Sequence, residues 1–297
     1  MRRVRVLINP NSGIGRSAGA LHGVFQQHWD VPGIDLTYQI SRSVEDGQEK
    51  TRRAMRDGAD TILVVGGDGM VNSVGRELVG SDVALGVIPA GSGNGFARHF
   101  NIPLHLPSAA RALAGAAVER IDVGTADGRP FFVTCSMAWD ADVAKHFDRS
   151  PVRGILPYVM AAAYGLIEYQ PQPLDASIDG RAFRRIGDPL VFTVANLTQY
   201  GGGAKIAPSA RPDDGFLELV VMHRQDAPRL LAGLPRLFDG TIDQLPEVET
   251  HRFRELRVKR DKPSAIQIDG EPIAAGTDVR IGVRPSALRV LAPRRTA

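Results

Sequence analysis

The stretch that decides the fold is Leu63-Val64-Val65-Gly66-Gly67-Asp68-Gly69-Met70-Val71-Asn72. The β-favouring residues from Ile62 to Val65 run directly into Gly-Gly-Asp-Gly, and Val71, Val74 and Leu78 then follow at helical spacing. We therefore expect a strand, a glycine turn and the N-terminus of a helix. Backbone N–H groups converge at such a junction, and they favour an anion such as a phosphate.

Asp68 is the one acid in this turn, and a carboxylate does not attract a phosphate directly. The coordination of Mg²⁺ or the abstraction of a proton would suit it better. The alternative is a tight turn in which the Asp only caps a helix. Short glycine motifs recur by chance, so the turn alone leaves both interpretations open.

Two further glycine-bearing loops also follow expected strands. Asn9–Gly15 follows the strand Val4–Ile8, and Pro89–Gly95 follows the strand Ala84–Ile88. Strands alternate with helical segments up to about residue 120, which indicates a parallel, three-layer α/β domain. The carboxyl ends of parallel strands lie on one edge of the sheet, where ligands bind. We therefore expect the three loops to share a phosphate-handling edge.

The pattern changes after Ile121–Gly124. Short strands are expected at 131–136, 190–195, 216–221, 256–259, 265–268 and 279–283. Turn signals such as Asp214-Gly215 and Asp269-Gly270 separate several of them, and helices are expected at about 157–169 and 228–238. This spacing indicates an antiparallel sheet or sandwich.

The composition suits a globular protein with a sizeable core, since 43% of the 297 residues are hydrophobic and 23% are charged. The net charge of +3 comes from scattered basic residues, so we expect no nucleic-acid partner. Phosphate ligands or an anionic membrane surface remain compatible with it. The single Cys135 excludes an internal disulfide, and its apolar neighbours favour a buried core thiol.

The N-terminus, Met1-Arg2-Arg3-Val4, leads directly into a strand without the apolar region of a signal peptide. No apolar run approaches the roughly 20 residues that a membrane-spanning helix needs. We expect a cytoplasmic protein whose membrane contact is peripheral and transient. The apolar segment 151–170 can contact a lipid, but a core helix is the more frequent explanation.

Short motifs follow one another along nearly the whole chain. They are Asn9-Pro10-Asn11-Ser12-Gly13, Gly66-Gly67-Asp68-Gly69 with Asn72, Pro89-Ala90-Gly91-Ser92-Gly93-Asn94, Trp139-Asp140-Ala141, Tyr200-Gly201-Gly202-Gly203, Ile206-Ala207-Pro208, Asp213-Asp214-Gly215 and Asp269-Gly270-Glu271. Together they resemble the diacylglycerol kinase catalytic-domain family, which includes bacterial lipid kinases and sphingosine kinases.

The resemblance implies two domains. Residues 1–124 would form an α/β nucleotide-binding domain similar to those of phosphofructokinase and NAD kinase. Residues 125–285 would form a β-rich sandwich domain for the lipid, and about 286–297 would return to the first domain.

The resemblance also implies a reaction, the Mg²⁺-dependent transfer of the γ-phosphate of ATP to a hydroxyl of diacylglycerol or a related lipid, with a long-chain base as an alternative acceptor. The ATP contacts would come from Asn9, Ser41, Gly66, Gly67, Asp68, Gly69, Met70, Val71, Asn72, Gly91, Ser92 and Asn94. A homodimer is an open alternative to a monomer.

Three acids receive catalytic roles from the resemblance. Glu271 matches the proton acceptor of the bacterial enzymes, whereas the sphingosine kinase branch gives that role to the acid at Asp68. Asp68 would also hold the catalytic Mg²⁺, and Asp140 would position the metal or the base. Without the family, an ordinary β-turn would be the favoured interpretation of Asp269-Gly270-Glu271.

A second, structural Mg²⁺ would be held by the Asp214 carboxylate and the carbonyl oxygens of Arg211 and Phe216. Oxygen ligands of this kind suit magnesium. The alternative is a plain Asp-Gly hairpin turn.

Three positions depart from the family pattern: Met70 replaces the usual Thr, Ser73 stands where Glu often follows the Asn, and Gly95 replaces an Asp of many bacterial relatives. They keep two alternatives open. One is a kinase for a soluble substrate, similar to NAD kinase, and the other is a nucleotide- or lipid-binding protein with impaired catalysis.

Overall fold

A computed structural model describes residues 1–10, 12, 23–138 and 172–294. The chain divides into two compact units, one of Met1–Ile121 with Ser286–Ala297 and one of Asp122–Pro285. The helix expected at about 157–169 and the Trp139-Asp140-Ala141 motif lie outside the described residues.

The first unit contains a parallel sheet in the order β2-β1-β3-β4. Its strands are β1 (Arg2–Ile8), β2 (Ile34–Ile40), β3 (Thr61–Gly66) and β4 (Ala84–Pro89). Both β3 and β4 are buried along their whole length, as is usual for apolar strands in the centre of an α/β sheet. The end of β18 (Asp278–Ala292) runs parallel to β4, and its Arg289 pairs with Ala84.

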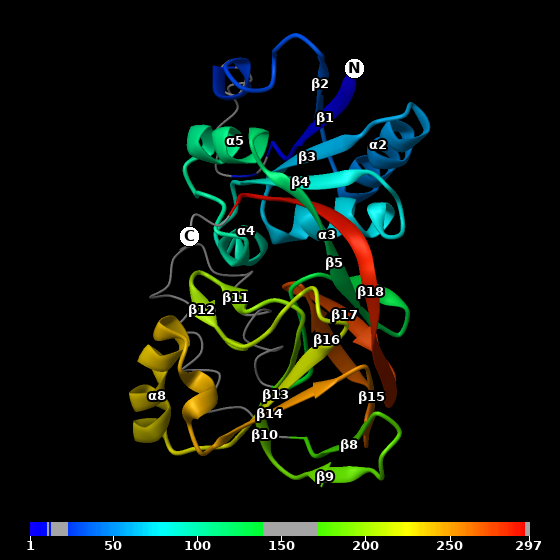
Figure 1. Cartoon of the computed structure of the whole chain (residues 1–297). Coiled ribbons are helices and arrows are strands. Elements are labelled where there is room, and N and C mark those ends of the chain that lie inside the picture. The colour runs from blue at the N-terminus through cyan, green and yellow to red at the C-terminus, as the bar shows by residue number, and fades with distance from the viewer. Residues whose placement is uncertain (11, 13–22, 139–171, 295–297) are drawn as a thin grey trace. The chain divides into compact units, whose positions relative to one another are not determined.

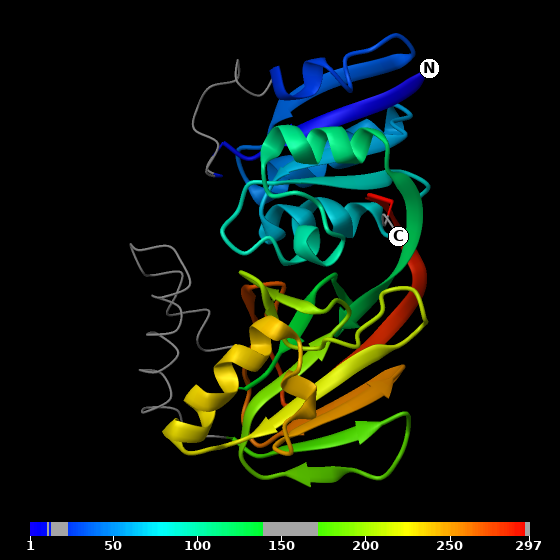
Figure 2. The ribbon, with the colours of Figure 1, turned by 60° about the vertical axis from the view of Figure 1, so that its left-hand side comes forward.

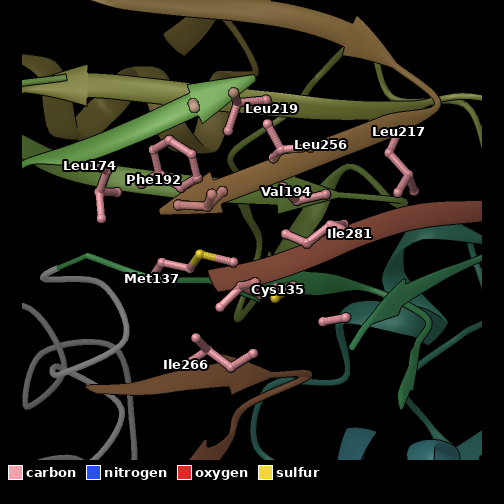
Figure 3. Packing of buried hydrophobic residues seen from close by; sticks show 14 of the residues in the cluster. Cys135, Met137, Leu174, Phe192, Val194, Leu217, Leu219, Leu256, Ile266 and Ile281 are labelled. Atoms are coloured by element: carbon pink, nitrogen blue, oxygen red, sulfur yellow. The ribbon is translucent and has the colours of Figure 1, made fainter. Parts of the chain in front are cut away.

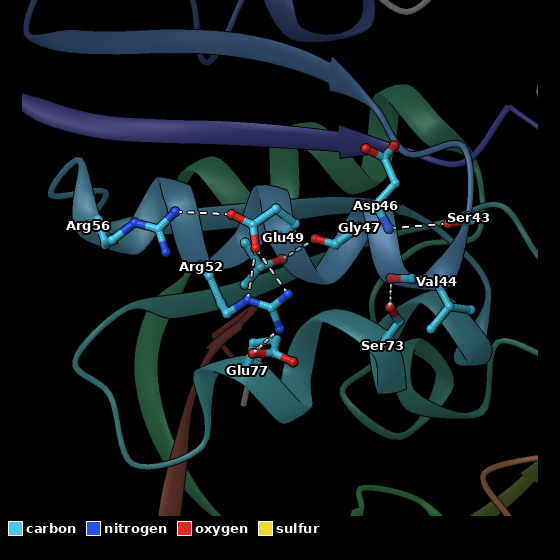
Figure 4. A network of polar contacts seen from close by, with 10 residues as sticks. Ser43, Val44, Asp46, Gly47, Glu49, Arg52, Arg56, Ser73 and Glu77 are labelled. Atoms are coloured by element: carbon cyan, nitrogen blue, oxygen red, sulfur yellow. Dashed lines mark hydrogen bonds and ion pairs between the residues drawn. The ribbon is translucent and has the colours of Figure 1, made fainter.

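The helices whose full bounds lie among the described residues of this unit are α2 (Val44–Arg56), α3 (Asp68–Leu78), α4 (Gly95–His99) and α5 (Leu106–Ala114), and they pack beside the sheet (Figure 1). Ser43 is the N-cap of helix α2, and its hydroxyl accepts a hydrogen bond from the Asp46 N–H. Helices α2 and α3 lie side by side, joined by an ion pair between Arg52 and Glu77 (Figure 4).

The second unit is built from antiparallel strands (Figure 2). One six-stranded sheet has the order β14-β13-β10-β7-β16-β17. Its strands are β7 (Thr134–Ser136), β10 (Pro189–Ala195), β13 (Leu217–His223), β14 (Val248–Phe253), β16 (Ser264–Ile268) and β17 (Glu271–Ala275).

The remaining elements of this unit include strands that pair with the first part of β18. Of these elements, β5 (Ala117–Ala126) and β15 (Glu255–Arg260) pair with β18. The others are β6 (Arg129–Phe131), β8 (Leu174–Ile178), β9 (Arg184–Ile186), the hairpin β11 (Gln199–Gly201) with β12 (Ala204–Lys205), helix α8 (Ala227–Asp239) and the 3₁₀ turn η1 (Ile242–Gln244).

The core of the second unit lies between its two sheets (Figure 3). Phe192 and Leu219 come from the six-stranded sheet, and Leu256 and Ile281 come from the strands that face it. Cys135 is fully buried in the same cluster as a free thiol, which confirms the expectation from its apolar neighbours. This packing confirms the β-rich sandwich predicted from the spacing of the strands.

The segment 131–136 differs from the prediction of one strand, because the chain leaves the strand conformation between Phe131 and Thr134. The N–H groups of Phe132, Val133 and Thr134 donate to the carboxylate of Asp269, at 2.8, 2.7 and 3.0 Å. These donors bond a side chain instead of a neighbouring strand, so the ladder is interrupted here.

Candidate functional site

The three predicted loops begin at the carboxyl edge of the parallel sheet. The Asn9 N–H donates to the Val65 carbonyl at 3.0 Å, and the Ala90 N–H donates to the Gly66 carbonyl at 2.9 Å. Ser41, which follows β2, donates its N–H to the Ile8 carbonyl at 2.7 Å. The strands β1, β3 and β4 therefore end next to one another, and the first residues of the three loops lie at one edge of the sheet, whereas residues 11 and 13–15 of the first loop lie outside the described residues.

The two glycine loops after β3 and β4 meet backbone to backbone. A Cβ atom added to Gly67 would lie 3.1 Å from the Cα of Gly91, and one added to Gly91 would lie 2.6 Å from the Cα of Gly67. Any side chain at either position would force the loops apart. The glycines thus permit a close approach that this edge of the sheet requires.

Helix α3 begins directly after this contact, with Gly67 as its N-cap. The Met70 and Val71 N–H groups donate to the Gly67 carbonyl, at 3.0 and 3.1 Å. Among the described residues, no side chain caps this helix, so its N-terminus keeps the partial positive charge that attracts anions. Gly69 lies in this same first turn and adds no side chain there.

Asp68 is the first residue of α3, but its carboxylate caps a different helix. Its Oδ2 accepts the Gly95 N–H at 2.9 Å and its Oδ1 accepts the Phe96 N–H at 3.1 Å, and these are the first two residues of α4. Burial raises the pKa of Asp68, while the bonds from Gly95 and Phe96 and the nearby Arg98 act in the opposite direction. The backbone N–H of Gly95 is therefore one of the donors that hold the Asp68 carboxylate.

The loop Gly91–Asn94 is also fixed by its own side chains. Asn94 adopts a left-handed conformation with φ of 51°, and its amide bonds both sides of Gly91. The Gly91 N–H donates to Oδ1 at 2.9 Å, and Nδ2 donates to the Gly91 carbonyl at 2.8 Å. Arg98 Nε donates to the Gly93 carbonyl at 3.1 Å. Ser92 lies exposed in this hydrogen-bonded loop.

Met70 and Asn72 are buried in the first turns of α3. The Met70 side chain covers the backbone of Gly66, since a Cβ added there would lie 2.9 Å from the Met70 sulfur. The Asn72 amide oxygen accepts a hydrogen bond from Arg76 Nη2, one helical turn further on. Position 70 therefore provides packing and no hydroxyl, and the orientation of the Asn72 amide is set by Arg76.

The serines near α2 bond the chain itself. Ser41 Oγ donates to the Ser43 carbonyl at 3.0 Å, and Ser73 Oγ donates to the Val44 carbonyl at 3.2 Å. A Cβ added to Gly47 would lie 2.7 Å from Ser41 Oγ, so the glycine leaves room for this hydroxyl inside α2. Because the Ser41 hydroxyl already donates its proton to the Ser43 carbonyl, it could contact a nucleotide only as an acceptor.

Glu271 lies in the second unit and opens β17 directly after a tight turn. Asp269 and Gly270 both have positive φ angles, 47° and 95°, and Ile268 pairs with Glu271 across the turn. This is the geometry of a two-residue hairpin, for which Asp-Gly is a preferred sequence. The Glu271 side chain is exposed, and within the described part of the chain it forms no ion pair.

Asp214 lies in the turn predicted to hold a structural metal. Its Oδ1 accepts the Phe216 N–H at 3.1 Å, and its Oδ2 pairs with Arg252 at 2.5 Å. The guanidinium of Arg252 also lies 4.6 Å from the centre of the Phe216 ring. Arg211 binds Asp213 in the same turn. The guanidinium of Arg252 therefore already neutralises the charge of the Asp214 carboxylate.

Two family models cover most of the chain. The model described as "Diacylglycerol kinase catalytic domain" matches residues 3–126, and the one described as "YegS C-terminal NAD kinase beta sandwich-like domain" matches residues 133–292. A protein of Mycobacterium tuberculosis named "Diacylglycerol kinase" is 30% identical over 299 residues, which covers 98% of this chain and 96% of that protein. This chain belongs to the diacylglycerol kinase family.

Other relatives agree with this family assignment. A protein of Pseudomonas fluorescens named "Probable lipid kinase YegS-like" is 28% identical over 275 residues, which covers 88% of this chain and 87% of that protein. A crystal structure of a diacylglycerol kinase from Bacillus anthracis superposes with a TM-score of 0.73 at 18% identity, over 98% of this chain and 97% of that chain. A second structure from that organism reaches a TM-score of 0.79 at 17% identity. At these identities the superpositions show the fold alone.

Asp140, one of the predicted site residues of this family member, lies outside the described residues. Within the described residues, no group of three or more His, Cys, Asp or Glu side chains could hold a metal ion. No helix among them is both long and apolar enough to cross a membrane.

Sequence reasoning missed Arg98 and Arg76 as parts of this site. Arg98 braces Gly93, and Arg76 orients Asn72. For Arg76 a signal existed, because a spacing of four residues places it on the same helix face as Asn72. For Arg98 the partner is a loop carbonyl, which no sequence pattern identifies.

Proposed function

We propose that this diacylglycerol kinase family member is an ATP- and Mg²⁺-dependent lipid kinase that phosphorylates a hydroxyl of diacylglycerol or a related lipid. The family match over both units supports a lipid acceptor, because the relatives that cover the chain are named as kinases of this class. The observation that carries the phosphate site is the contact of Gly67 with Gly91 at the N-terminus of α3.

Phosphoryl transfer needs the phosphates held and their charge neutralised more than it needs covalent chemistry. The N-terminus of α3 supplies N–H groups without side-chain caps in the described residues, and these suit an anion. The glycines at 67, 69 and 91 let a phosphate approach the backbone closely, whereas the backbone of Gly66 is covered by the Met70 side chain. We place the ATP phosphates at this edge, with Ser92 exposed at the tip of the second loop.

The residues present fit an Mg²⁺ ion that arrives with ATP. Such ions are usually held by one or two carboxylates together with the phosphates of the substrate. An ionised carboxylate has about four acceptor positions, so Asp68 can bond the N–H groups of α4 and still accept from a metal-bound water. When bound, Mg²⁺ would neutralise the charge that develops on the phosphates.

The second Mg²⁺, predicted at Arg211, Asp214 and Phe216, stays a prediction. Asp214 Oδ2 is paired with Arg252, so a metal would have to replace this guanidinium. We assign no chemical step to this ion.

We assign the proton acceptor to Glu271 in preference to Asp68. Glu271 is exposed at the first position of β17, where it pairs with Ile268 across the two-residue turn. Both oxygens of Asp68 accept backbone N–H groups, and a proton taken up by this carboxylate would weaken those bonds. Glu271 would take the proton from the acceptor hydroxyl as the phosphoryl group transfers. Asp140 stays a candidate for positioning the metal or the base.

The function is tested by thin-layer chromatography with labelled ATP and Mg²⁺. The acceptors are diacylglycerol in mixed micelles, a long-chain base and NAD⁺. We expect a labelled lipid with diacylglycerol or the long-chain base, and no labelled product in a reaction with Glu271→Gln.

Labelled NADP⁺ would instead identify a kinase for a soluble substrate. The absence of product with every acceptor, together with ATP binding measured by calorimetry, would show a binding protein with impaired catalysis.

A further inference from the structure

Asp68 joins two segments that are far apart in sequence. Its carboxylate accepts from Gly95 and Phe96, which follow it by 27 and 28 residues. Each oxygen takes one N–H, at 2.9 and 3.1 Å, so the side chain is fixed at both of its acceptors. The bonds connect the first residue of α3 to the first turn of α4.

The other restraints on the second glycine loop are of a different kind. Asn94 bonds Gly91, and Arg98 bonds Gly93, so both act within the loop and its own helix. They fix the shape of the loop without fixing its position against α3. Among the described residues, the bonds across to the first loop come from Asp68 and from the Ala90 N–H to the Gly66 carbonyl.

We propose that Asp68 is a positioning residue, whose carboxylate holds the Gly91–Asn94 loop against the N-terminus of α3 so that both loops form one phosphate-binding edge. This inference rests on the proposed function in one respect, that the phosphates of ATP bind at this edge. It explains why the two backbones can remain in contact at Gly67 and Gly91, where any side chain would separate them.

The arrangement also explains how an acid is tolerated in a site for phosphates. The carboxylate oxygens are directed at the N–H groups that begin α4, whose partial positive charge balances them. Arg98 on the same helix contributes a full positive charge to the surroundings of Asp68. The acid is therefore compensated within the protein before any nucleotide binds.

The positioning role differs measurably from a role as base. A base supplies its effect in the transfer step, so its loss lowers kcat and leaves the affinity for ATP unchanged. A residue that positions the phosphate-binding loop affects ATP affinity directly, and the acidic limb of the pH profile of kcat stays in place after its substitution. Asn at this position keeps one acceptor oxygen but turns an N–H towards the second donor, so it restores the loop only in part.

The test compares Asp68→Ala and Asp68→Asn with the control Asp226→Ala. Asp226 caps α8 in the second unit by accepting the Arg229 N–H at 3.0 Å, so its loss removes a helix cap of the same chemistry away from the glycine loops. Hydrogen–deuterium exchange of the peptide that spans residues 90–100 reports the loop, and calorimetry with ATP and Mg²⁺ reports the affinity.

We expect faster exchange at Gly95 and Phe96 in Asp68→Ala, with a smaller change in Asp68→Asn. The affinity for ATP should fall about tenfold in Asp68→Ala, because two hydrogen bonds of ordinary strength are lost. Asp226→Ala should leave the exchange of residues 90–100 and the affinity for ATP at the wild-type values. Its Tm should nevertheless fall by about as much as that of Asp68→Ala, because each variant loses a helix cap.

Unchanged exchange in the soluble Asp68 variants would overturn the inference. So would a loss of kcat at wild-type ATP affinity, since that result places Asp68 in the transfer step. The exchange measurement needs no activity, so a wild-type protein that phosphorylates no acceptor would contradict the proposed function and leave the anchoring of the loop to be decided by exchange.

Discussion

Gly67 and Gly91 face each other so closely that a Cβ on Gly91 would lie 2.6 Å from the Cα of Gly67. The contact joins two loops that follow neighbouring strands, β3 and β4. A side chain here meets backbone, which cannot turn away as a flexible side chain would. The close contact of the two loops therefore depends on the absence of a side chain at both glycines.

Gly91→Ala should separate the loops, lowering the free energy of unfolding by about 1–3 kcal/mol, as overpacking does, and weakening ATP binding. The matched control is Gly115→Ala at the end of α5, where an added Cβ meets nothing within 4 Å and φ is −97°. Urea unfolding and calorimetry measure the two effects. Equal results for the two variants would show that the contact has no importance for the site.

Asp269 is expected to be a structural residue of the second unit. It is 7% exposed and accepts three N–H groups of residues 132–134. Asp269→Asn can keep the left-handed backbone conformation but loses charge and one acceptor, so we expect a loss of about 2 kcal/mol in unfolding free energy.

Asp179→Asn is the control for this prediction. Asp179 has the same φ of 47° and also precedes a glycine, but it is exposed, and its carboxylate accepts from only two backbone N–H groups in the described residues. Its loss should stay below about 1 kcal/mol, because water replaces the lost bonds. Losses of equal size in urea unfolding would contradict the importance that we give to burial.

Much of the first unit could be predicted from sequence because its central strands are continuous apolar runs that end in glycine loops. The sandwich was harder to predict. Strand β14 was missed because Glu249, Thr250, His251 and Arg252 occupy its middle, so it carries almost no hydrophobic signal. The helix α5 was missed for another reason: its start lacks a side-chain cap in the described residues.

The candidate site shows the same limit. The sequence of the turn at Gly66 predicted either a chemical or a capping role for Asp68. The helix that Asp68 caps begins 27 residues further along the chain. A cap of this kind depends on tertiary structure, so no pattern near Asp68 could identify α4 as its partner. Local sequence locates the loops, whereas the bonds between loops require the fold.

Glu249 should make stability depend on pH. Arg184 binds it through two nitrogens, at 2.8 and 3.0 Å, and this bonding, assisted by His223 and His251, lowers the pKa of Glu249 to about 2. A lowered pKa stabilises the folded state above the ordinary pKa of a Glu, and the contribution disappears as the pH falls from about 4.5 to about 2.

The predicted contribution is about 1 kcal/mol at pH 7, reduced by the partial exposure of the pair to solvent. Glu249→Gln should therefore destabilise the protein at neutral pH and should approach the wild type at about pH 2. Glu119→Gln, at an exposed side chain of the first unit, serves as the control. Urea unfolding across this range checks the prediction, and a pH-independent difference would contradict it.

The Asp214 turn gives a last prediction, on metal dependence. Because Arg252 already pairs with Asp214 Oδ2, we expect EDTA and Mg²⁺ to leave the Tm of the nucleotide-free protein unchanged. Arg252→Gln removes that positive charge, so Mg²⁺ should then raise the Tm by binding the free carboxylate.

Arg254→Gln is the control for the Asp214 turn, because Arg254 also lies 4.6 Å from the Phe216 ring. It should remain insensitive to Mg²⁺, since the Asp214–Arg252 pair stays intact. A rise of the wild-type Tm with Mg²⁺ that Asp214→Asn abolishes would instead establish the structural metal, and Arg252 would then have to leave Asp214 when the ion binds.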